Sequence, residues 1–324
     1  MAEHTFIKSD KYVSLGLAAL YQMSVLPNFF KRVGGDIFKG AKNDTVNWVT
    51  GRVTTARDYE WRTRTEPIVL DKIGQTQVDI KLDTHLYQGV PLTNEQMTLD
   101  VKTFAREIVE PQVSALVARA EGKVVSGLRS AEFKTPMGAF TEEDDPYKWA
   151  LRVRQLLNSQ GAPRSGRAFL VGAAVENWLL GSDRIAPPNV TPEQSRAIRE
   201  AQLGRLAGFD IIPVPALEDD EVFAVTSDAL IVANVAPERP RGAPQSARQA
   251  ADGWSLLHTF GYQEMYQQDT SILSTFMGVN SVNDELQVER DADTKLPKLV
   301  LDDNGDPIPT GKNVRGTYGR LTEA

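Results

Sequence analysis

The stretch TNEQMTLDVKTFAREIVEPQVSALVARAEGKVVSGL, residues 93–128, is the longest helix-compatible run in the chain. Thr93 is suited to cap a helix, and Glu95 and Gln96 are residue types that the first turn favours. Apolar residues then recur at helical spacing, at Val101, Phe104, Ala105, Ile108, Leu116 and Val117. At about 1.5 Å per residue, twenty-five or more helical residues span roughly 40 Å, which is more than a small core needs from one helix. We therefore expect residues 93–128 to form a long spine helix.

Pro111 lies inside this stretch. A proline within a helix removes one backbone hydrogen bond, and its ring clashes with the preceding turn. We therefore expect the spine to bend near Val109.

The composition is that of an ordinary globular protein. The chain has 324 residues, of which 41% are hydrophobic, enough for one large or two modest domains. Its 36 Lys and Arg against 43 Asp and Glu give a net charge of -7, which argues against a dedicated nucleic-acid binder. The absence of cysteine excludes disulfides, thiolate catalysis and cysteine-ligated metals, and fits a reducing cytoplasm. Neither a signal peptide nor an apolar run of membrane-spanning length is found, so we expect no membrane partner.

Before the spine, the chain has two segments of different character. Residues 1–45 carry one helical pattern, Tyr12 to Leu26, followed by a glycine-rich tract, and we expect a solvated N-terminal arm. Residues 46–90 contain two strand-like runs separated by a long polar tip. Because a two-stranded ribbon is marginal in water, another surface must cover it. That surface is a partner subunit or the body of the same chain, and the pattern leaves both open.

The tip of the ribbon has the residue types of a protein contact. Arginines alternate with acidic residues there, and two aromatic residues are interspersed. Such a mixture suits a salt-bridged contact with a partner surface. The candidate contact residues are Arg52, Arg57, Tyr59, Trp61, Arg62 and Arg64.

After the spine, the pattern alternates between helix and strand. The acidic run Glu142 to Asp145 precedes a helical pattern, Pro146 to Ser159. We interpret this run as a helix cap, because four consecutive carboxylates cannot all face one metal ion. Further segments are expected in the order strand 168–171, helix 173–180, helix 192–207, and strands 209–214, 222–225, 229–235, 256–262 and 272–282.

No constellation in the sequence predicts an enzyme, a cofactor or a metal site. His4, His85 and His258 are far apart and lack a partner at metal-ligand or triad spacing. The tract 161–167 precedes a strand and lacks the ending of a phosphate loop, so we expect a turn. The run Asp302 to Asp306 lacks the distant glutamate of a calcium loop and predicts a hairpin turn.

Three short segments, together with the order of the parts, resemble a known family. They are GRLAGFDIIPVP at 204–215, RAFLV at 167–171, before the helix that carries Trp178 and Leu179, and DALIVA at 228–233. The chain resembles the major capsid protein of tailed bacteriophages, whose fold is shared with herpesviruses and encapsulins.

The resemblance implies an α+β fold with four parts. These are an N-terminal arm (1–45), an extended two-stranded loop lying over a neighbouring subunit (46–90), a peripheral domain with the spine helix (91–140 and 255–324), and an α/β axial domain (141–254).

The resemblance also implies a function. The chain would form hexamers and pentamers of an icosahedral shell that encloses double-stranded phage DNA, assembled in the host cytoplasm and found in the virion. Implied partners are further copies of the chain, a separate scaffolding protein, since the arm is too short to act as one, a portal protein at one vertex, and DNA as a non-specific neighbour. The alternatives are an encapsulin-like nanocompartment shell with an enzyme cargo, or a soluble α/β enzyme.

Overall fold

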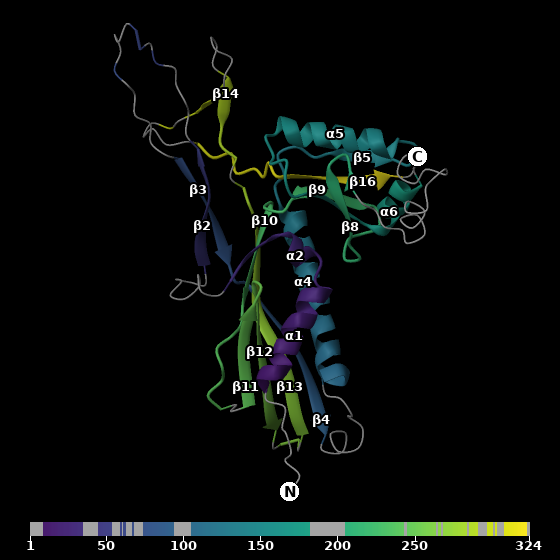
Figure 1. Ribbon diagram of the computed structural model, residues 1–324, viewed down its shortest axis with the longest axis vertical. Helices are drawn as coiled ribbons and strands as arrows, with labels where there is room; N and C mark the ends of the chain where they lie inside the picture. Colours follow the sequence, from purple (N-terminus) through teal and green to yellow (C-terminus); the bar gives the residue numbers. More distant parts are fainter. Residues whose placement is uncertain are drawn as a thin grey trace.

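The structure of the chain is a computed structural model. It describes residues 9–34, 45–53, 59, 61–62, 67, 74–93, 105–181, 205–242, 245–263, 265–266, 268–283, 285–290, 297–300, 302 and 308–322. The molecule is elongated, with a larger sheet and its helices at one end and a smaller sheet with its helices at the other (Figure 1). Mixed helices and sheets of this kind confirm the predicted α+β class.

The larger sheet is built around one long strand, β13 (Gln268–Ser281), which pairs with strands on both sides. Its strand order is β1-β10-β13-β12-β11, and β4 also pairs with β13. The other strands are β1 (Lys31–Val33), β4 (Thr84–Thr93), β10 (Leu230–Val235), β11 (Gln245–Ala251) and β12 (Trp254–Gln263). Every second residue of β13 from Ser271 to Met277 is at most 1% exposed, so one face of the strand is covered.

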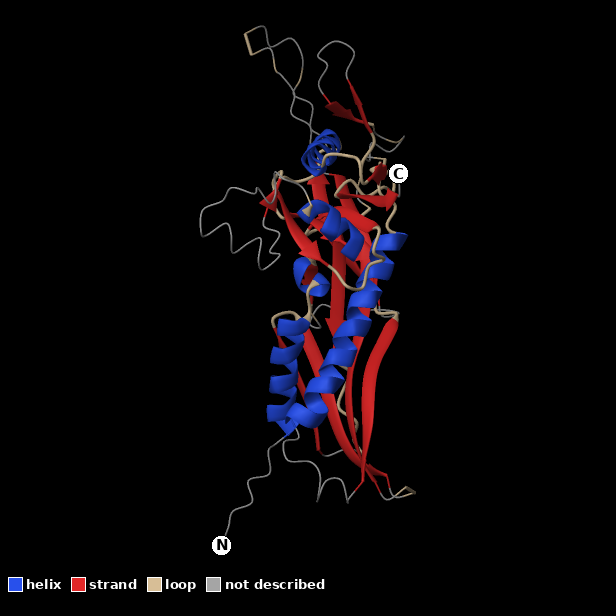
Figure 2. Cartoon of the chain, turned by 90° about the vertical axis from the view of Figure 1, so that its right-hand side faces the viewer, coloured by secondary structure: helices blue, strands red, loops and turns tan. Residues whose placement is uncertain are grey.

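Helices cover that face of the larger sheet (Figure 2). They are α1 (Ser9–Met23), α2 (Leu26–Phe29), a π-helix, η3 (Ala105–Val109), and α4 (Glu110–Ser130). The buried side of α4 repeats at helical spacing and packs into the main core, at Val113, Leu116, Val117, Ala120, Val124, Val125 and Leu128. α4 therefore lies along the sheet as one long amphipathic helix.

The predicted start of the spine at Thr93 is wrong. Thr93 is the last residue of β4 and pairs with Gln268, because the strand pattern of residues 84–93 continues to that position. Residues 94–104 lie outside the described part. Within the stretch 93–128, the described helical structure begins with η3 at Ala105 and continues as α4 from Glu110.

The expectation of a solvated arm is wrong for α1. Its side chains Val13, Leu17 and Leu20 are at most 5% exposed and belong to the same core as α4. α1 contacts β11, β12 and α4. The apolar stripe in this segment is therefore part of the body of the molecule.

The smaller sheet has the order β5-β16-β9-β6-β8-β7. Its strands are β5 (Gly138–Thr141), β6 (Arg167–Val171), β7 (Arg205–Leu206), β8 (Phe209–Pro213), β9 (Glu221–Thr226) and β16 (Gly316–Thr322). Two helices pack on it, α5 (Pro146–Ser159) and α6 (Ala173–Leu180). Its core is aromatic, with the Phe169 and Phe209 rings stacked at 4.2 Å between centroids and Trp149 4.8 Å from Phe140.

Several local predictions in this region are confirmed. The helix of residues 146–159 starts as expected: the Asp145 carboxylate accepts hydrogen bonds from the backbone N–H groups of Tyr147 (2.9 Å) and Lys148 (3.3 Å). The helix 173–180 and the strand at 168–171 are also present. Of the expected helix 192–207, residues 192–204 lie outside the described part, and Arg205 and Leu206 form β7 instead.

The strands cross the expected domain boundaries. β10 and β11, expected in the axial segment 141–254, belong to the larger sheet, whereas β16, from the expected peripheral segment, belongs to the smaller one. Residues 84–90, which the expected extended loop includes, form part of β4 and pair with β13. The division into arm, loop, peripheral and axial domains remains a prediction.

Two short ribbons complete the fold. β2 (Thr45–Val53) pairs with β3 (Gly74–Lys81) in antiparallel order, and β14 (Val288–Arg290) pairs with β15 (Pro297–Leu299). Of the turn expected at 302–306, only Asp302 lies among the described residues. None of the helices that the structure describes combines the length and apolar composition needed to cross a bilayer.

Candidate assembly surfaces

The base of the β2–β3 ribbon is anchored on the body of its own chain. Val78 and Ile80 of β3 are at most 6% exposed and form a cluster with Val33, Ile231 and Val282. The Lys31 ammonium lies 4.7 Å from the centre of the Trp48 ring, and the Asn280 side-chain amide donates to the backbone carbonyl of Asp79. The body of the chain therefore covers the base of the ribbon.

The described residues beyond the base are exposed. Trp61 is 64% exposed and Tyr59 is 42% exposed. The Arg62 guanidinium lies 5.1 Å from the centre of the Trp61 ring, so the two side chains present one combined surface. Arg52 belongs to β2, with its side chain outside the described part, and Arg57 and Arg64 lie outside it altogether. The structure thus shows three of the six predicted contact residues, and all three face outward.

Pro111 is exposed and lies in the first turn of α4, directly after the π-helix η3. Because a helical turn precedes it, Pro111 lacks a backbone N–H that could otherwise donate to a carbonyl of that turn. The hydrogen-bonding pattern of the helix therefore changes where the sequence placed a bend, and the bend itself remains a prediction.

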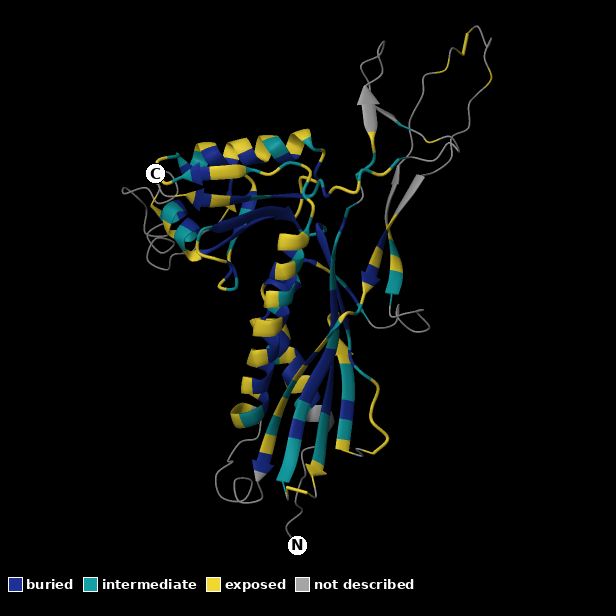
Figure 3. Ribbon diagram, turned by 180° about the vertical axis from the view of Figure 1, so that it is seen from behind, coloured by how far each residue is buried: buried dark blue, intermediate teal, exposed yellow. Residues whose placement is uncertain are grey.

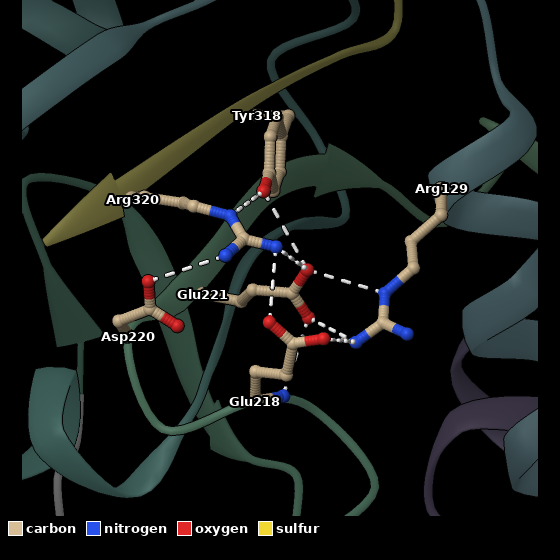
Figure 4. A network of polar contacts seen from close by, with 6 residues as sticks. All are labelled: Arg129, Glu218, Asp220, Glu221, Tyr318 and Arg320. Carbon is tan, nitrogen blue, oxygen red and sulfur yellow. Dashed lines mark hydrogen bonds and ion pairs between the residues drawn. The ribbon is translucent and has the colours of Figure 1, made fainter.

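An ionic cluster joins the end of α4 to the smaller sheet (Figure 4). Its centre is Glu221, the first residue of β9, whose side chain is 1% exposed. The Glu221 carboxylate accepts from Arg129 of α4, at 2.6 Å from Nη2 and 3.1 Å from Nε, and from Arg320 Nη2 of β16 at 3.1 Å. Glu218 accepts from the same two guanidiniums, and Arg320 also contacts Asp220 and the Tyr318 hydroxyl. We call these six residues the junction cluster.

The electrostatics of the junction cluster favour the charged state of Glu221. Burial by itself raises the pKa of the Glu221 carboxyl, but hydrogen bonds and charge from Arg129, together with the charge of Arg320, outweigh it and lower that pKa. Hydrogen bonding to Glu221 raises the pKa of Arg129. A cavity of about 260 Å³ lies beside the cluster, lined by Leu128, Arg129, Ala131, Phe133, Glu221, Phe223, Tyr318 and Arg320. The cluster thus connects α4 to the smaller sheet through ionised side chains.

Sequence reasoning missed an exposed apolar patch at the β12–β13 turn. Met265 is 87% exposed, Tyr266 67% and Tyr262 54%. Met265 and Tyr266, two large side chains between two predicted strands, were a usable signal, because turns usually carry small polar residues. Tyr87 on β4 is also 70% exposed.

The described histidines are not arranged for catalysis. His258 Nε2 lies 2.9 Å from the Ser271 hydroxyl, which is the pairing of a base with a nucleophile, but these residues are only 1% and 0% exposed. The Ser271 hydroxyl also donates to Gln112 of α4 at 3.2 Å. Burial lowers the pKa of His258 to about 4. The hydrogen-bonded side chains of Gln112, His258 and Ser271 therefore link α4 to β12 and β13 within the core. The other described histidine, His85, lies at an exposed position of β4.

The described Asp, Glu and His side chains are likewise not gathered at one place. Among the residues that the structure describes, no group of three or more His, Asp or Glu side chains could hold a metal ion.

Comparison with known proteins places the fold, although no family model and no curated protein matches the sequence. A chain in the structure of Mycobacterium phage Che8 is 14% identical, with a TM-score of 0.57 over 92% of this chain and 91% of that chain. A chain in the capsid structure of cyanophage P-SCSP1u is 8% identical, with a TM-score of 0.58 over 93% and 89%. A virus-like particle from Pyrococcus furiosus is 12% identical, with a TM-score of 0.50 over 84% and 93%. The chain therefore has the major capsid protein fold of tailed bacteriophages.

Proposed function

We propose that the chain is the major capsid protein of a tailed bacteriophage, which self-assembles into hexamers and pentamers of an icosahedral shell around double-stranded DNA. The observation that carries this proposal is the match of fold along 93% of the chain to a chain in a phage capsid structure. A match of this extent includes both sheets and the segment between them, so it concerns the whole subunit.

The β2–β3 ribbon supports assembly. Its base packs on its own subunit, while Tyr59, Trp61 and Arg62 are exposed. Aromatic residues and arginine are the types that most often carry the binding energy of protein interfaces. The proposed role of the ribbon is to lie over a neighbouring subunit, with Arg52, Arg57 and Arg64 contributing to the same contact.

The proposed partners follow from this role. They are further copies of the chain, a separate scaffolding protein, a portal protein at one vertex, and packaged DNA. The net charge of -7 supports DNA as a non-specific neighbour of the shell. Assembly would take place in the host cytoplasm, and the protein would then reside in the virion capsid.

A nanocompartment shell is the second candidate, because the same fold occurs in the virus-like particle from Pyrococcus furiosus. The two candidates share self-assembly and differ in content. An enzymatic role has no comparable support among the described residues, since the enclosed His258 and Ser271 are out of reach of a substrate.

Electron microscopy of the purified protein tests the proposal. Negatively stained samples, prepared alone and with candidate scaffolding protein, should contain capsomers or closed shells. A monodisperse monomer under all assembly conditions would overturn it. Particles from infected cells distinguish the candidates, because nuclease-protected duplex DNA identifies a capsid and a protein cargo identifies a nanocompartment.

A further inference from the structure

The smaller sheet carries a buried arginine that no carboxylate among the described residues neutralises. Arg167, the first residue of β6, is 3% exposed. Its guanidinium donates to the backbone carbonyls of Pro163 (2.7 Å) and Ala162 (2.8 Å) and lies 5.8 Å from the centre of the Phe209 ring. Within the described part of the chain, its contacts include no acidic side chain. Because carbonyl groups carry no net charge, these contacts leave the positive charge of Arg167 uncompensated.

Two exposed arginines add to this charge. Arg154 of α5 donates to the carbonyl of Ala207 at 3.2 Å, and Arg164 follows α5 in the loop to β6. Arg154 bonds to Ala207, two residues before the Phe209 that contacts Arg167, and Arg164 follows Pro163, whose carbonyl accepts from Arg167, so the three arginines form one positive region. Burial lowers the pKa of Arg167, and the charges of Arg154 and Arg164 lower it further. None of the three forms an ion pair with a described carboxylate. The nearby Arg205, by contrast, pairs with Asp210 at 2.7 Å. We call Arg154, Arg164 and Arg167 the arginine end.

Two exposed glutamates lie at the other end of the same sheet. Glu142 and Glu143 directly follow β5, and no cation among the described residues pairs with either of them. The Trp178 indole N–H donates to the Glu142 carbonyl at 3.1 Å and holds this loop on α6. The adjacent carboxylates are occupied, since Asp144 lies 3.6 Å from Arg152 and Asp145 caps α5. We call Glu142 and Glu143 the acidic end.

Strand register places these two ends apart. β5 ends at Thr141, which pairs with Thr322 at the end of β16, so the acidic end follows the last residues of β16. Arg167 pairs with Thr226 at the end of β9, next to Val225, which pairs with Gly316 at the start of β16. α5 lies across the sheet between the two ends and measures about 21 Å over its 14 residues (Figures 1 and 3).

We propose that the arginine end of one subunit binds the acidic end of the next copy in a head-to-tail contact that closes the capsomer ring. Opposite charges on opposite ends of one domain are what a heterologous contact requires, and such contacts form rings when the rotation closes. This inference rests on the proposed function. A second copy is favoured over nucleic acid as the occupant, because phosphate binding would use the arginine end alone, whereas the chain also supplies the matching acidic end.

Charge reversal tests the contact on the full chain. The first variant is Arg154→Glu with Arg164→Glu, and the second is Glu142→Lys with Glu143→Lys. All four positions are exposed, so the changes should leave folding intact, which thermal unfolding checks. Arg167 is left unchanged, because its hydrogen bonds hold the loop before β6. Arg239→Glu with Arg241→Glu is the matched control, with the same change in net charge at two exposed arginines outside the smaller sheet.

The capsomer yield of either variant alone should be at least about tenfold lower than that of the parent chain, because side chains of like charge then meet at every contact. An equimolar mixture of the two restores complementary contacts only when the variants alternate around a ring. Native mass spectrometry and electron microscopy should therefore find hexamers and no pentamers in the mixture. A quadruple variant, complementary to itself, should recover both rings.

Other outcomes would overturn the inference. They are normal assembly of both double variants, or failure of both the mixture and the quadruple variant to recover rings. Loss of duplex DNA binding by the arginine variant with normal assembly would also overturn it and would identify a nucleic-acid site. If the parent chain itself forms no capsomers, the proposed function fails first, so the two failures are distinguishable.

Discussion

Arg129 and Glu221 form a bidentate ion pair, with Nη2 to Oε2 at 2.6 Å and Nε to Oε1 at 3.1 Å. The two residues belong to different parts of the molecule, Arg129 to the last turn of α4 and Glu221 to the first position of β9 in the smaller sheet. A planar guanidinium fixes the direction as well as the distance of a bound carboxylate. This pair therefore helps to set the orientation of the smaller sheet relative to α4.

We predict that Glu221→Gln destabilises the subunit. The change leaves two guanidiniums facing a neutral amide at a nearly inaccessible position. Removing one member of a buried ion pair costs about 3–5 kcal/mol. Because Arg129 and Arg320 are 42% and 45% exposed, solvent screens them, and we expect a loss of about 2 kcal/mol in the free energy of unfolding at pH 7. Urea unfolding measures it.

The effect should depend on pH in a defined direction. The pKa of Glu221 is lower in the folded state than in the unfolded state, so the charged cluster adds stability above the unfolded pKa of about 4.3. That contribution is lost as the pH falls through the folded pKa, and the difference between the parent chain and Glu221→Gln should shrink there. Glu218→Gln is the control, since its side chain is 52% exposed and should cost less than about 1 kcal/mol. A pH-independent difference would contradict the prediction.

A second pH effect should come from His258. Its pKa is about 4 in the fold and about 6.5 when unfolded, so the unfolded chain binds more protons between these values. The contribution of neutral His258 to the free energy of unfolding is fully present above pH 6.5 and falls by about 3 kcal/mol as the pH drops to 4. His258→Gln should remove this part of the pH dependence, measured as urea midpoints at several pH values, whereas His85→Gln on an exposed position should not. An unchanged slope in the His258 variant would rule out this source.

Local sequence patterns predicted the elements whose signals lie within a few residues. Asp145 before Pro146 defined the start of α5, and continuous apolar residues defined β6. The same reasoning failed at Thr93, because a residue that suits a helix cap also suits a strand, and its partner in β13 lies far along the chain. Strand pairing is a non-local property that a local pattern does not contain.

The surfaces were predictable only in part. The aromatic and arginine content of the ribbon tip was visible, and the exposure of Trp61 agrees with it. The junction cluster could not be predicted, since Arg129 and Glu221 are 92 positions apart and each has the sequence context of an ordinary surface charge. The stripe on α1 was also visible, but nothing in the sequence indicated that it packs on β11, β12 and α4.

Gly278 should tolerate no side chain. A Cβ there would lie 2.1 Å from the backbone carbonyl oxygen of Lys81, where the chain leaves the ribbon and crosses β13. We expect Gly278→Ala to cost about 1–3 kcal/mol, because backbone must move. Gly122→Ala is the control: an added Cβ there would meet no atom within 4 Å apart from its neighbours and the backbone of its own helix, α4, and the change should stabilise by about 0.5–1 kcal/mol. Thermal unfolding distinguishes them, and a neutral Gly278 variant would show that the crossing can shift.

The ribbon tip should matter for assembly and not for folding. Trp61→Ser combined with Arg62→Ser removes an exposed pair, so the melting temperature should change by no more than about 2 °C. If a neighbouring subunit covers the pair, shell yield should fall by about tenfold or more, counted by electron microscopy. Tyr87→Ser, which removes another exposed aromatic side chain, is the matched control. Equal losses in both would mean that general surface polarity is responsible and not the ribbon.

Pro111 provides the last test, because it separates folding from shell geometry. The residue is exposed in the first turn of α4, so Pro111→Ala removes no core packing and should leave the melting temperature within about 2 °C of the parent value. Alanine restores the backbone N–H and relieves the restriction on the residue before it, so the π-helical hydrogen bonds of Ala105–Val109 can convert to α-helical ones. Loss of the predicted bend would tilt one end of the subunit relative to the other and change the curvature of the shell. We therefore expect a shift in particle diameter or yield, measured on the same micrographs, and shells of unchanged size and number would remove Pro111 from the determinants of curvature.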